Sequence, residues 1–320
     1  MTQQRTTLSR RWFLNSARVA ASIPVAAACG SPTAATVPEQ TPDGGPPEMQ
    51  VRLTALDERL AEIENRHAVR LAVHAHSPAN GRTYTHRGDE RFAMCSTFKV
   101  YAAAGILQLE AEGRLRLDDT VAVEPGDIVV NSPVTSEHQG RVMTYEQLCE
   151  AALTRSDNTA GNLLLRRLGG PDAVTAFARS VGDDATRLDR WEPELNDAAR
   201  GDERDTTTPA GSARGYRELL LGSALDPARR RILTGWMRAS VTSDTRMRAG
   251  LPPGWVAADK SGGGNFATLN AAGVVWSPEG EPLVLVILSD TTTGDRDAPF
   301  ADASIVDTTA ALVSAMSAVP

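Results

Sequence analysis

A serine and a lysine three residues apart form the clearest candidate for catalytic chemistry in this chain. Ser96 and Lys99 lie at the start of a segment of strong helix formers, Val100 to Gly113. This spacing places the hydroxyl and the amine one turn apart on one helical face. A serine needs a partner that takes its proton, and the free amides at a helix N-terminus can stabilise an oxyanion. The pair therefore predicts a nucleophilic serine.

Lysine usage sharpens this prediction, because Ser-x-x-Lys alone is weak. Lys99 and Lys260 are the only lysines among 33 basic residues. Arginine stays protonated in proteins, whereas a desolvated lysine near another cation can release its proton. Two surface lysines left by chance are the simpler alternative. The replacement of lysine by arginine elsewhere favours a specific role for Lys99.

Overall composition is that of a globular enzyme. The chain has a net charge of -7 and a pI of about 5.4, with 41% apolar and 23% charged residues. The one basic run, Arg229 to Arg231, fits a solvated helix face. Nothing therefore indicates nucleic-acid binding. The length allows one large or two medium domains.

The N-terminal residues 1–29 are predicted to be an export signal. Ser9 to Leu14 closely matches the twin-arginine pattern, and the apolar run Val19 to Ala28 is too short to span a bilayer. Small residues before Cys29 favour lipidation of that cysteine, with an ordinary Ala-x-Ala cleavage as the alternative. Residues 30–47 read as a flexible linker. We expect export to the periplasm or the outer face of the cell envelope.

The cysteines and the paired histidines predict no disulfide framework and no metal site. With Cys29 assigned to the signal, Cys95 and Cys149 are expected to be buried free thiols. A catalytic Cys95 is the alternative, but no histidine lies nearby in sequence. His74 and His76 share one strand face without a further ligand at metal spacing, so we expect solvated histidines. No cofactor is expected.

The periodicity predicts an antiparallel five-stranded sheet flanked by two terminal helices, with a helical lobe inserted. We expect one catalytic domain over 48–320, in which 48–90 and 238–320 form an α/β lobe and 91–237 an all-α lobe. The pattern indicates helices around 53–63 and 300–317, strands at 69–76, 82–86, 255–260, 268–276 and 282–289, and turns at 80–81, 262–264 and 278–280. From 95 to 237 we expect helices and loops without a strand. The cleft between the lobes is the expected ligand site.

Two further motifs offer matching chemistry. Ser156-Asp157-Asn158 precedes a helix predicted over 160–168, and it supplies a hydroxyl for proton relay and an amide for a substrate carbonyl. As a bare tripeptide it is more often a helix cap. Lys260-Ser261-Gly262 ends a predicted strand, where a cation and a hydroxyl project beside glycines that let a substrate approach.

Together the three motifs, in this order and spacing, closely resemble the signatures of serine β-lactamases and penicillin-binding proteins. The resemblance runs from about Glu48 to the C-terminus and implies their two-lobed α/β plus all-α fold. The segment from Arg190 to Thr207, which contains Glu192 and Asn196, resembles the omega loop of class A β-lactamases. A polar surface loop is the simpler alternative for this segment.

The resemblance to class A implies a role for each site residue. Ser96 would attack the lactam carbonyl, with Lys99, or Glu192 through water, as the base. The substrate would be a β-lactam antibiotic and the enzyme a monomer. The backbone amides of Ser96 and Gly263 would form the oxyanion hole, Ser156 would pass a proton to the lactam nitrogen, and Glu192 and Asn196 would hold the deacylating water.

The resemblance also implies how the substrate is bound. Lys260 and Ser261, beside Gly262, would bind its carboxylate, and Asn158 would bind its amide. Arg190 and Asp205 would pair at the base of the omega loop.

Several positions depart from common patterns of that family. Leu269 stands where many members carry a carboxylate-binding arginine, and Arg246 lies where others place a substitute. Asn131 occupies a gate position that is usually aromatic. Cys149 matches one half of a disulfide found in some members, but Ala103 stands at the other half. We therefore expect Arg246 to bind the carboxylate and this bridge to be absent.

Two functions of other classes remain as alternatives. A D,D-peptidase would use the same serine and lysine on cell-wall peptides but would lack the deacylating glutamate, so Glu192 argues against it. A drug-sensing lipoprotein would be acylated and stop there. Steady turnover of a β-lactam distinguishes hydrolysis from both.

Overall fold

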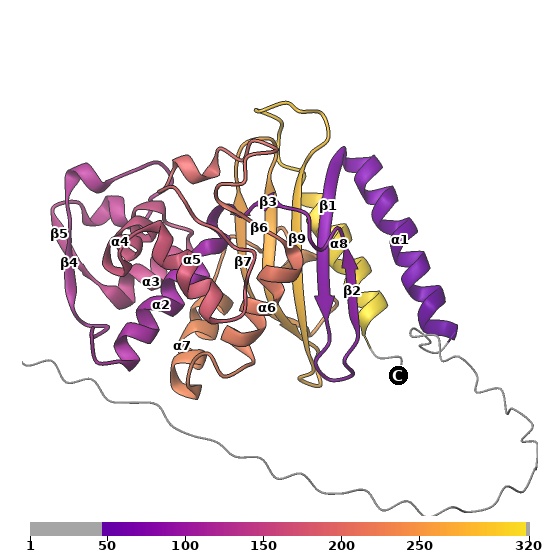
Figure 1. Cartoon of the computed structure of the whole chain (residues 1–320), viewed down its shortest axis with the longest axis horizontal. Helices are drawn as coiled ribbons and strands as arrows, with labels where there is room; N and C mark the ends of the chain where they lie inside the picture. Colours follow the sequence, from indigo (N-terminus) through magenta and orange to yellow (C-terminus); the bar gives the residue numbers. More distant parts are fainter. Residues whose placement is uncertain (1–46, 318–320) are drawn as a thin grey trace, which may run out of the picture. The chain divides into compact units, whose positions relative to one another are not determined.

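Five antiparallel strands form the central sheet in the computed structural model, which describes residues 47–317 (Figure 1). The strands are β1 (Val69–His76), β2 (Thr83–His86), β7 (Val256–Gly263), β8 (Leu269–Trp276) and β9 (Pro282–Thr291). Their order is β2-β1-β9-β8-β7, and every neighbouring pair is antiparallel. The predicted five-stranded sheet is confirmed.

Different helices cover the two apolar faces of this sheet. They are α1 (Pro47–His67) and α8 (Asp302–Met316) on one face and α6 (Pro209–Leu220) on the other. Alternate residues of a strand point to opposite faces. In β9, Leu285 therefore belongs to the core that contains Leu312 of α8, whereas Val286 belongs to the core that the helical part shares. Both terminal helices flank the sheet as predicted.

The inserted part of the chain is mainly helical and is built around one buried helix. Its helices are α2 (Lys99–Ala111), α3 (Tyr145–Thr154), α4 (Asn158–Leu168), α5 (Pro171–Ser180) and α7 (Pro227–Arg238). Every residue of α2 from Lys99 to Leu107 is buried. A helix that is apolar all round must lie inside the fold, with other helices packed on its sides. α2 thus gives Lys99 a fixed, dry position.

Two short strand pairs correct the prediction that 95–237 contains no strand. β4 (Thr120–Val123) pairs with β5 (Arg141–Thr144), and β6 (Thr206–Thr207) pairs with β3 (Phe92–Ala93). Most residues of β4 and β5 are at least partly exposed, so their side chains carry little apolar alternation. Pairing between segments distant in the sequence, rather than local pattern, fixes these strands.

The predicted turn at 262–264 is also wrong, because β7 continues through Gly263. Gly262 pairs with Asn270 and Gly263 with Leu269, so the chain reverses only after the motif. A Cβ on Gly262 would lie 2.9 Å from the carbonyl oxygen of Met94. Here the glycine allows a strand to pass close to the segment that carries Ser96. It therefore marks a close approach and not a turn.

The predicted export signal, Cys29 and the linker as far as residue 46 lie outside the described residues. Pro47, the last residue assigned to the linker, begins α1. Over residues 47–317, none of the helices combines the length and apolar character needed to cross a membrane.

Candidate active site

Ser96 lies in a short 3-10 turn, η1 (Cys95–Phe98), that leads directly into α2. It is 7% exposed. The side-chain amide of Asn270 on β8 donates to the carbonyls of Ala93 at 2.8 Å and Met94 at 3.1 Å. The sheet therefore holds the residues just before the nucleophile. Cys95 has a φ of 46°, a strained value that fits a constrained site.

Lys99 Nζ lies within reach of Ser96 and of two other polar groups. It donates to Ser96 Oγ at 2.9 Å, to the carbonyl oxygen of Ser156 at 2.8 Å and to Asn158 Oδ1 at 2.6 Å. The predicted contact between hydroxyl and amine is confirmed. A Cβ on Gly161 of α4 would come within 2.9 Å of Lys99 Cε, so only glycine leaves room for the lysine chain.

Glu192 reaches the same point from the opposite wall. Its Oε1 lies 2.9 Å from Lys99 Nζ and accepts from Ser96 Oγ at 3.4 Å. Its backbone is held at both ends by Asn162 of α4, which accepts from Glu192 N at 2.9 Å and donates to its carbonyl oxygen at 2.9 Å. The carboxylate also accepts from Asn196 Nδ2. Glu192 is 2% exposed, so its negative charge is balanced mainly by Lys99.

A second buried ammonium lies at the other side of the cleft. Lys260 Nζ donates to Ser156 Oγ at 3.0 Å and to the carbonyl oxygen of Ser261 at 2.7 Å. Burial, with a smaller contribution from the nearby charge of Lys99, lowers the pKa of Lys260 well below its ordinary value. Ser261 Oγ lies 2.7 Å from Thr242 Oγ1. Lys260 and the hydroxyls beside it thus place several hydrogen-bond donors where an anionic ligand can bind.

Asp157 holds the loop that carries Ser156 and Asn158. Its carboxylate accepts from the amides of Val134 and Thr135, both at 2.9 Å, and from Ala160 N at 2.8 Å as the N-cap of α4. Asp157 is therefore the helix cap expected of a bare tripeptide, and the same contacts position Ser156 and Asn158.

Part of this cluster lines a cleft of about 660 Å³, whereas the buried Lys99, Glu192 and Lys260 are not among its lining residues. Ser96, Asn131, Ser156, Asn158, Asn196, Arg246, Ser261, Gly262 and Gly263 are all among its lining residues. Arg246 is held by a hydrogen bond from its Nε to Asp302 Oδ1 at 2.8 Å. Asn131 is exposed, with a φ of 58°. A neighbouring hollow of about 540 Å³ shares five residues with the cleft, namely Asn131, Asn158, Asn196, Gly263 and Phe300.

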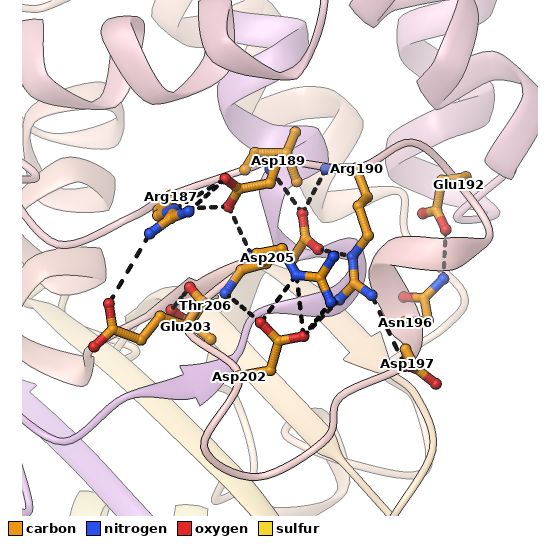
Figure 2. Close-up of polar contacts among 12 residues, drawn as sticks. Arg187, Asp189, Arg190, Glu192, Asn196, Asp197, Asp202, Glu203, Asp205 and Thr206 are labelled. Atoms are coloured by element: carbon orange, nitrogen blue, oxygen red, sulfur yellow. Dashed lines mark hydrogen bonds and ion pairs between the residues drawn. The ribbon is translucent and has the colours of Figure 1, made fainter.

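The omega loop, residues 190–205, is closed at its base by a charged pair. The buried carboxylate of Asp205 accepts from Arg190 Nε at 2.5 Å and from the backbone amides of Asp189 and Arg190 at 2.8 and 2.9 Å. The predicted pair is confirmed. Figure 2 shows Arg190 between Asp205 and Asp202, with Glu192 and Asn196 facing each other further along the loop.

Comparisons with known proteins agree with this geometry. Residues 55–316 match the model of the β-lactamase enzyme family. The chain is 46% identical to a β-lactamase of Streptomyces lavendulae, covering 90% of this chain and 92% of that one, and 41% identical to β-lactamase AST-1 of Nocardia asteroides, covering 96% of each. The chain belongs to the β-lactamase family.

Solved structures of β-lactamases have the same fold. A β-lactamase from Desulfarculus baarsii superposes with a TM-score of 0.80 at 44% identity, covering 83% of this chain and 99% of that one. An ancestral class A β-lactamase gives a TM-score of 0.77 at 50% identity, covering 82% and 100%. The two-lobed class A fold of this family member is thus shown by sequence and by structure.

The structure also places Leu269 and the two cysteines of the described residues. Leu269 is 1% exposed in the core beneath the terminal helices. Cys95 and Cys149 are buried free thiols, as predicted. Burial, with the nearby charge of Glu192, raises the pKa of the Cys95 thiol. A buried thiol that resists ionisation is a poor nucleophile, so the alternative of a catalytic Cys95 loses support.

Sequence reasoning missed several residues that position this β-lactamase site. Asn162 lies four residues after Asn158 on α4 and so on the same face, a spacing that could have identified it. Asn270 is a polar residue inside an otherwise apolar strand, which is also a usable signal. Thr242 and Phe300 lie in loops, and no local pattern singles them out.

Proposed function

We propose that this chain hydrolyses the β-lactam ring of antibiotics through an acyl-enzyme on Ser96 and so gives resistance to them. The observation that carries the proposal is the position of Glu192. Its carboxylate lies 2.9 Å from the ammonium of Lys99 and 3.4 Å from the hydroxyl of Ser96. A nucleophile, an amine and a carboxylate are therefore within proton-transfer distance in one buried place.

In the first stage, Ser96 Oγ attacks the lactam carbonyl and forms an ester as the C–N bond breaks. Lys99, or Glu192 through water, takes the hydroxyl proton. The backbone amides of Ser96 and Gly263 would stabilise the oxyanion. Ser156 would give a proton to the departing nitrogen, and its contact with Lys260 supports this role.

In the second stage, Glu192 activates a water that hydrolyses the ester. Asn196 donates to Glu192, whereas its own Oδ1 is buried and has no hydrogen-bond partner among the described residues. A buried acceptor of this kind is suited to binding a water. This arrangement supports hydrolysis over a D,D-peptidase, which has no such carboxylate.

Substrate binding follows from the charges and amides of the cleft. Lys260, Ser261 and Arg246 would bind the carboxylate of the antibiotic, and Asn158 would bind its side-chain amide. Asn131 and the glycines Gly262 and Gly263 would line the site. Many members of the family carry a carboxylate-binding arginine at the position of Leu269. Arg246 lines the cleft, which supports its assignment to that role here.

Turnover of nitrocefin tests the proposed function. We expect steady hydrolysis through many turnovers by the full chain. A single stoichiometric burst would instead indicate a sensor that is acylated and stops, and absence of any reaction would contradict the proposal.

We also propose that the chain is exported by the twin-arginine route and acts as a monomer in the cell envelope, held through a lipid on Cys29. A single chain supplies every residue of the proposed site. Mass spectrometry of the mature protein tests the anchor, since acylation of Cys29 adds a lipid mass, and size-exclusion chromatography tests the monomer.

A further inference from the structure

Phe300 is the one aromatic side chain among the described residues that line either the cleft or its neighbouring hollow. It lies just before α8 and is 49% exposed. Most other side chains lining the cleft are serines, asparagines and arginines. A single exposed apolar residue on a protein surface usually needs no explanation. Phe300 differs because it lines the same cleft as Ser96.

Two neighbours fix the ring of Phe300 in place. A Cβ on Gly263 would lie 3.1 Å from its Cζ, so the ring is packed against the edge of β7. The guanidinium carbon of Arg246 lies 5.7 Å from the ring centroid, within the range of a cation–π contact. Arg246 is itself held by Asp302, two residues beyond Phe300. The ring therefore forms a positioned wall beside the proposed oxyanion donor Gly263.

The position of the ring indicates which part of a substrate it would meet. If Arg246 and Ser261 bind the carboxylate, Phe300 flanks the fused ring that bears this carboxylate. In a cephalosporin, the carbon next to the one that carries the carboxylate bears the C3 substituent. The gate position of the same cleft, Asn131, has no aromatic ring. Phe300 is thus the available surface against which an apolar C3 group can be buried.

We propose that Phe300 is a specificity-determining residue that packs against aromatic C3 substituents of cephalosporins. This proposal rests on the proposed function and deepens it. Contacts between aromatic rings contribute modestly beyond the burial of area, so the effect should be a change in preference between substrates and not a loss of catalysis.

A matched pair of substrates tests the proposal. Nitrocefin and cephalothin share the thienylacetamido side chain, but only nitrocefin has an aromatic C3 group. We expect F300A in the full chain to lower kcat/KM for nitrocefin about three- to tenfold more than for cephalothin, mainly through KM. F300Y should keep the wild-type ratio, because it keeps the ring, and F300L should be intermediate.

Controls separate this proposal from other effects. V256A changes another exposed apolar residue, 46% exposed on β7 and outside the cleft lining, and should leave the ratio unchanged. Equal losses for both cephalosporins would overturn the role of Phe300 while the proposed hydrolysis stands. The role of Phe300 would also be overturned if F300A lowered kcat/KM more for benzylpenicillin, which has an acyl side chain, than for 6-aminopenicillanic acid, which has none. If wild-type protein hydrolyses benzylpenicillin but neither cephalosporin, the role of Phe300 is overturned and the proposed function stands. If it hydrolyses none of the three, the proposed function itself fails.

Discussion

The ammonium of Lys99 has more acceptors than protons. Three N–H donors face four oxygens, those of Ser96, Ser156, Asn158 and Glu192, at distances from 2.6 to 2.9 Å. Such a group can pass a proton to a neighbour with little movement of heavy atoms. Once Lys99 has passed a proton to Glu192, its neutral amine can take the proton of Ser96; while Lys99 stays protonated, Glu192 is the acceptor, so the geometry is compatible with either as the base of acylation.

Replacing Ser96 with alanine should abolish acylation. The change removes the oxygen that forms the ester, while the buried lysine keeps its other acceptors. Mass spectrometry after incubation with benzylpenicillin should show no added mass on S96A and a transient adduct on wild-type protein. A covalent drug adduct on S96A would contradict the assignment of the nucleophile.

Replacing Glu192 with alanine should leave a long-lived acyl-enzyme. Only the second stage must lose its water activator, and removal of a general base typically slows a step by about 10² to 10⁴. Rapid-quench mass spectrometry measures the lifetime of the adduct. E194A is the matched control, because Glu194 is an exposed carboxylate on the same loop. Undiminished turnover in E192A, or equal effects of both variants, would be the contrary result.

A contact between two site residues could be predicted from the sequence only where the residues lie close together in the chain. Ser96 and Lys99 are three residues apart, so helical geometry alone brings their side chains together, as the 2.9 Å contact shows. Asn270 acts from a strand far along the chain, through two backbone carbonyls. No spacing encodes such a contact, and only its polarity inside an apolar strand hints at it.

The omega loop depends on a few contacts at its base. Asp205 is fully buried and accepts from two backbone amides as well as from Arg190, so it joins the two ends of the loop. Asp202 approaches the same guanidinium only at 3.9 Å, and its side chain is 23% exposed. The two carboxylates should therefore contribute very differently to stability.

Changing Asp205 to asparagine should destabilise the folded protein by about 2 to 4 kcal/mol and slow deacylation, because a buried guanidinium contact loses its counter-charge. Urea unfolding and the lifetime of the acyl-enzyme measure the two effects. D202N should cost less than about 1 kcal/mol, as expected for a solvated pair. Equal destabilisation by both variants would show that the buried pair has no special role.

Element prediction succeeded where apolar periodicity is strong and failed where it is weak. The eight-residue β8 is buried almost throughout and was readable as a strand. β4 and β5 are short and largely exposed, so their sequences resemble loops. At Gly262, a residue type that usually marks turns instead serves a close approach between β7 and Met94.

At the scale of the whole molecule, two cores share one sheet. One core joins the sheet to the terminal helices, and the other joins it to the inserted helices. The order of predicted elements was enough to give this architecture, because a sheet with two apolar faces requires cover on both. The shape of the cleft was not predictable, since it depends on side chains from several distant loops.

The free energy of unfolding should fall in acid through His74. Burial lowers the pKa of this β1 histidine to about 4, with smaller effects from His76, Arg214 and Arg217. The expectation that His74 is a solvated histidine is therefore wrong, because its side chain is partly buried on β1. Between about pH 6.5 and 4 the unfolded chain binds a proton that the folded chain does not, so stability falls as the pH falls through this window.

We expect H74Q to remove this dependence. Relative to the variant, wild-type protein should lose about 2 kcal/mol between pH 7 and pH 4.5. Urea unfolding of both proteins across this range gives the comparison directly, since all other titrating groups are shared. Parallel stability profiles for the two proteins would contradict it.

The two lysines of the chain are both fully buried, so the folded domain displays no side-chain ammonium at its surface. Reagents that acylate primary amines should therefore leave Lys99 and Lys260 unmodified while the domain stays folded. Lysine-specific proteases would likewise have no accessible cleavage site until the domain unfolds.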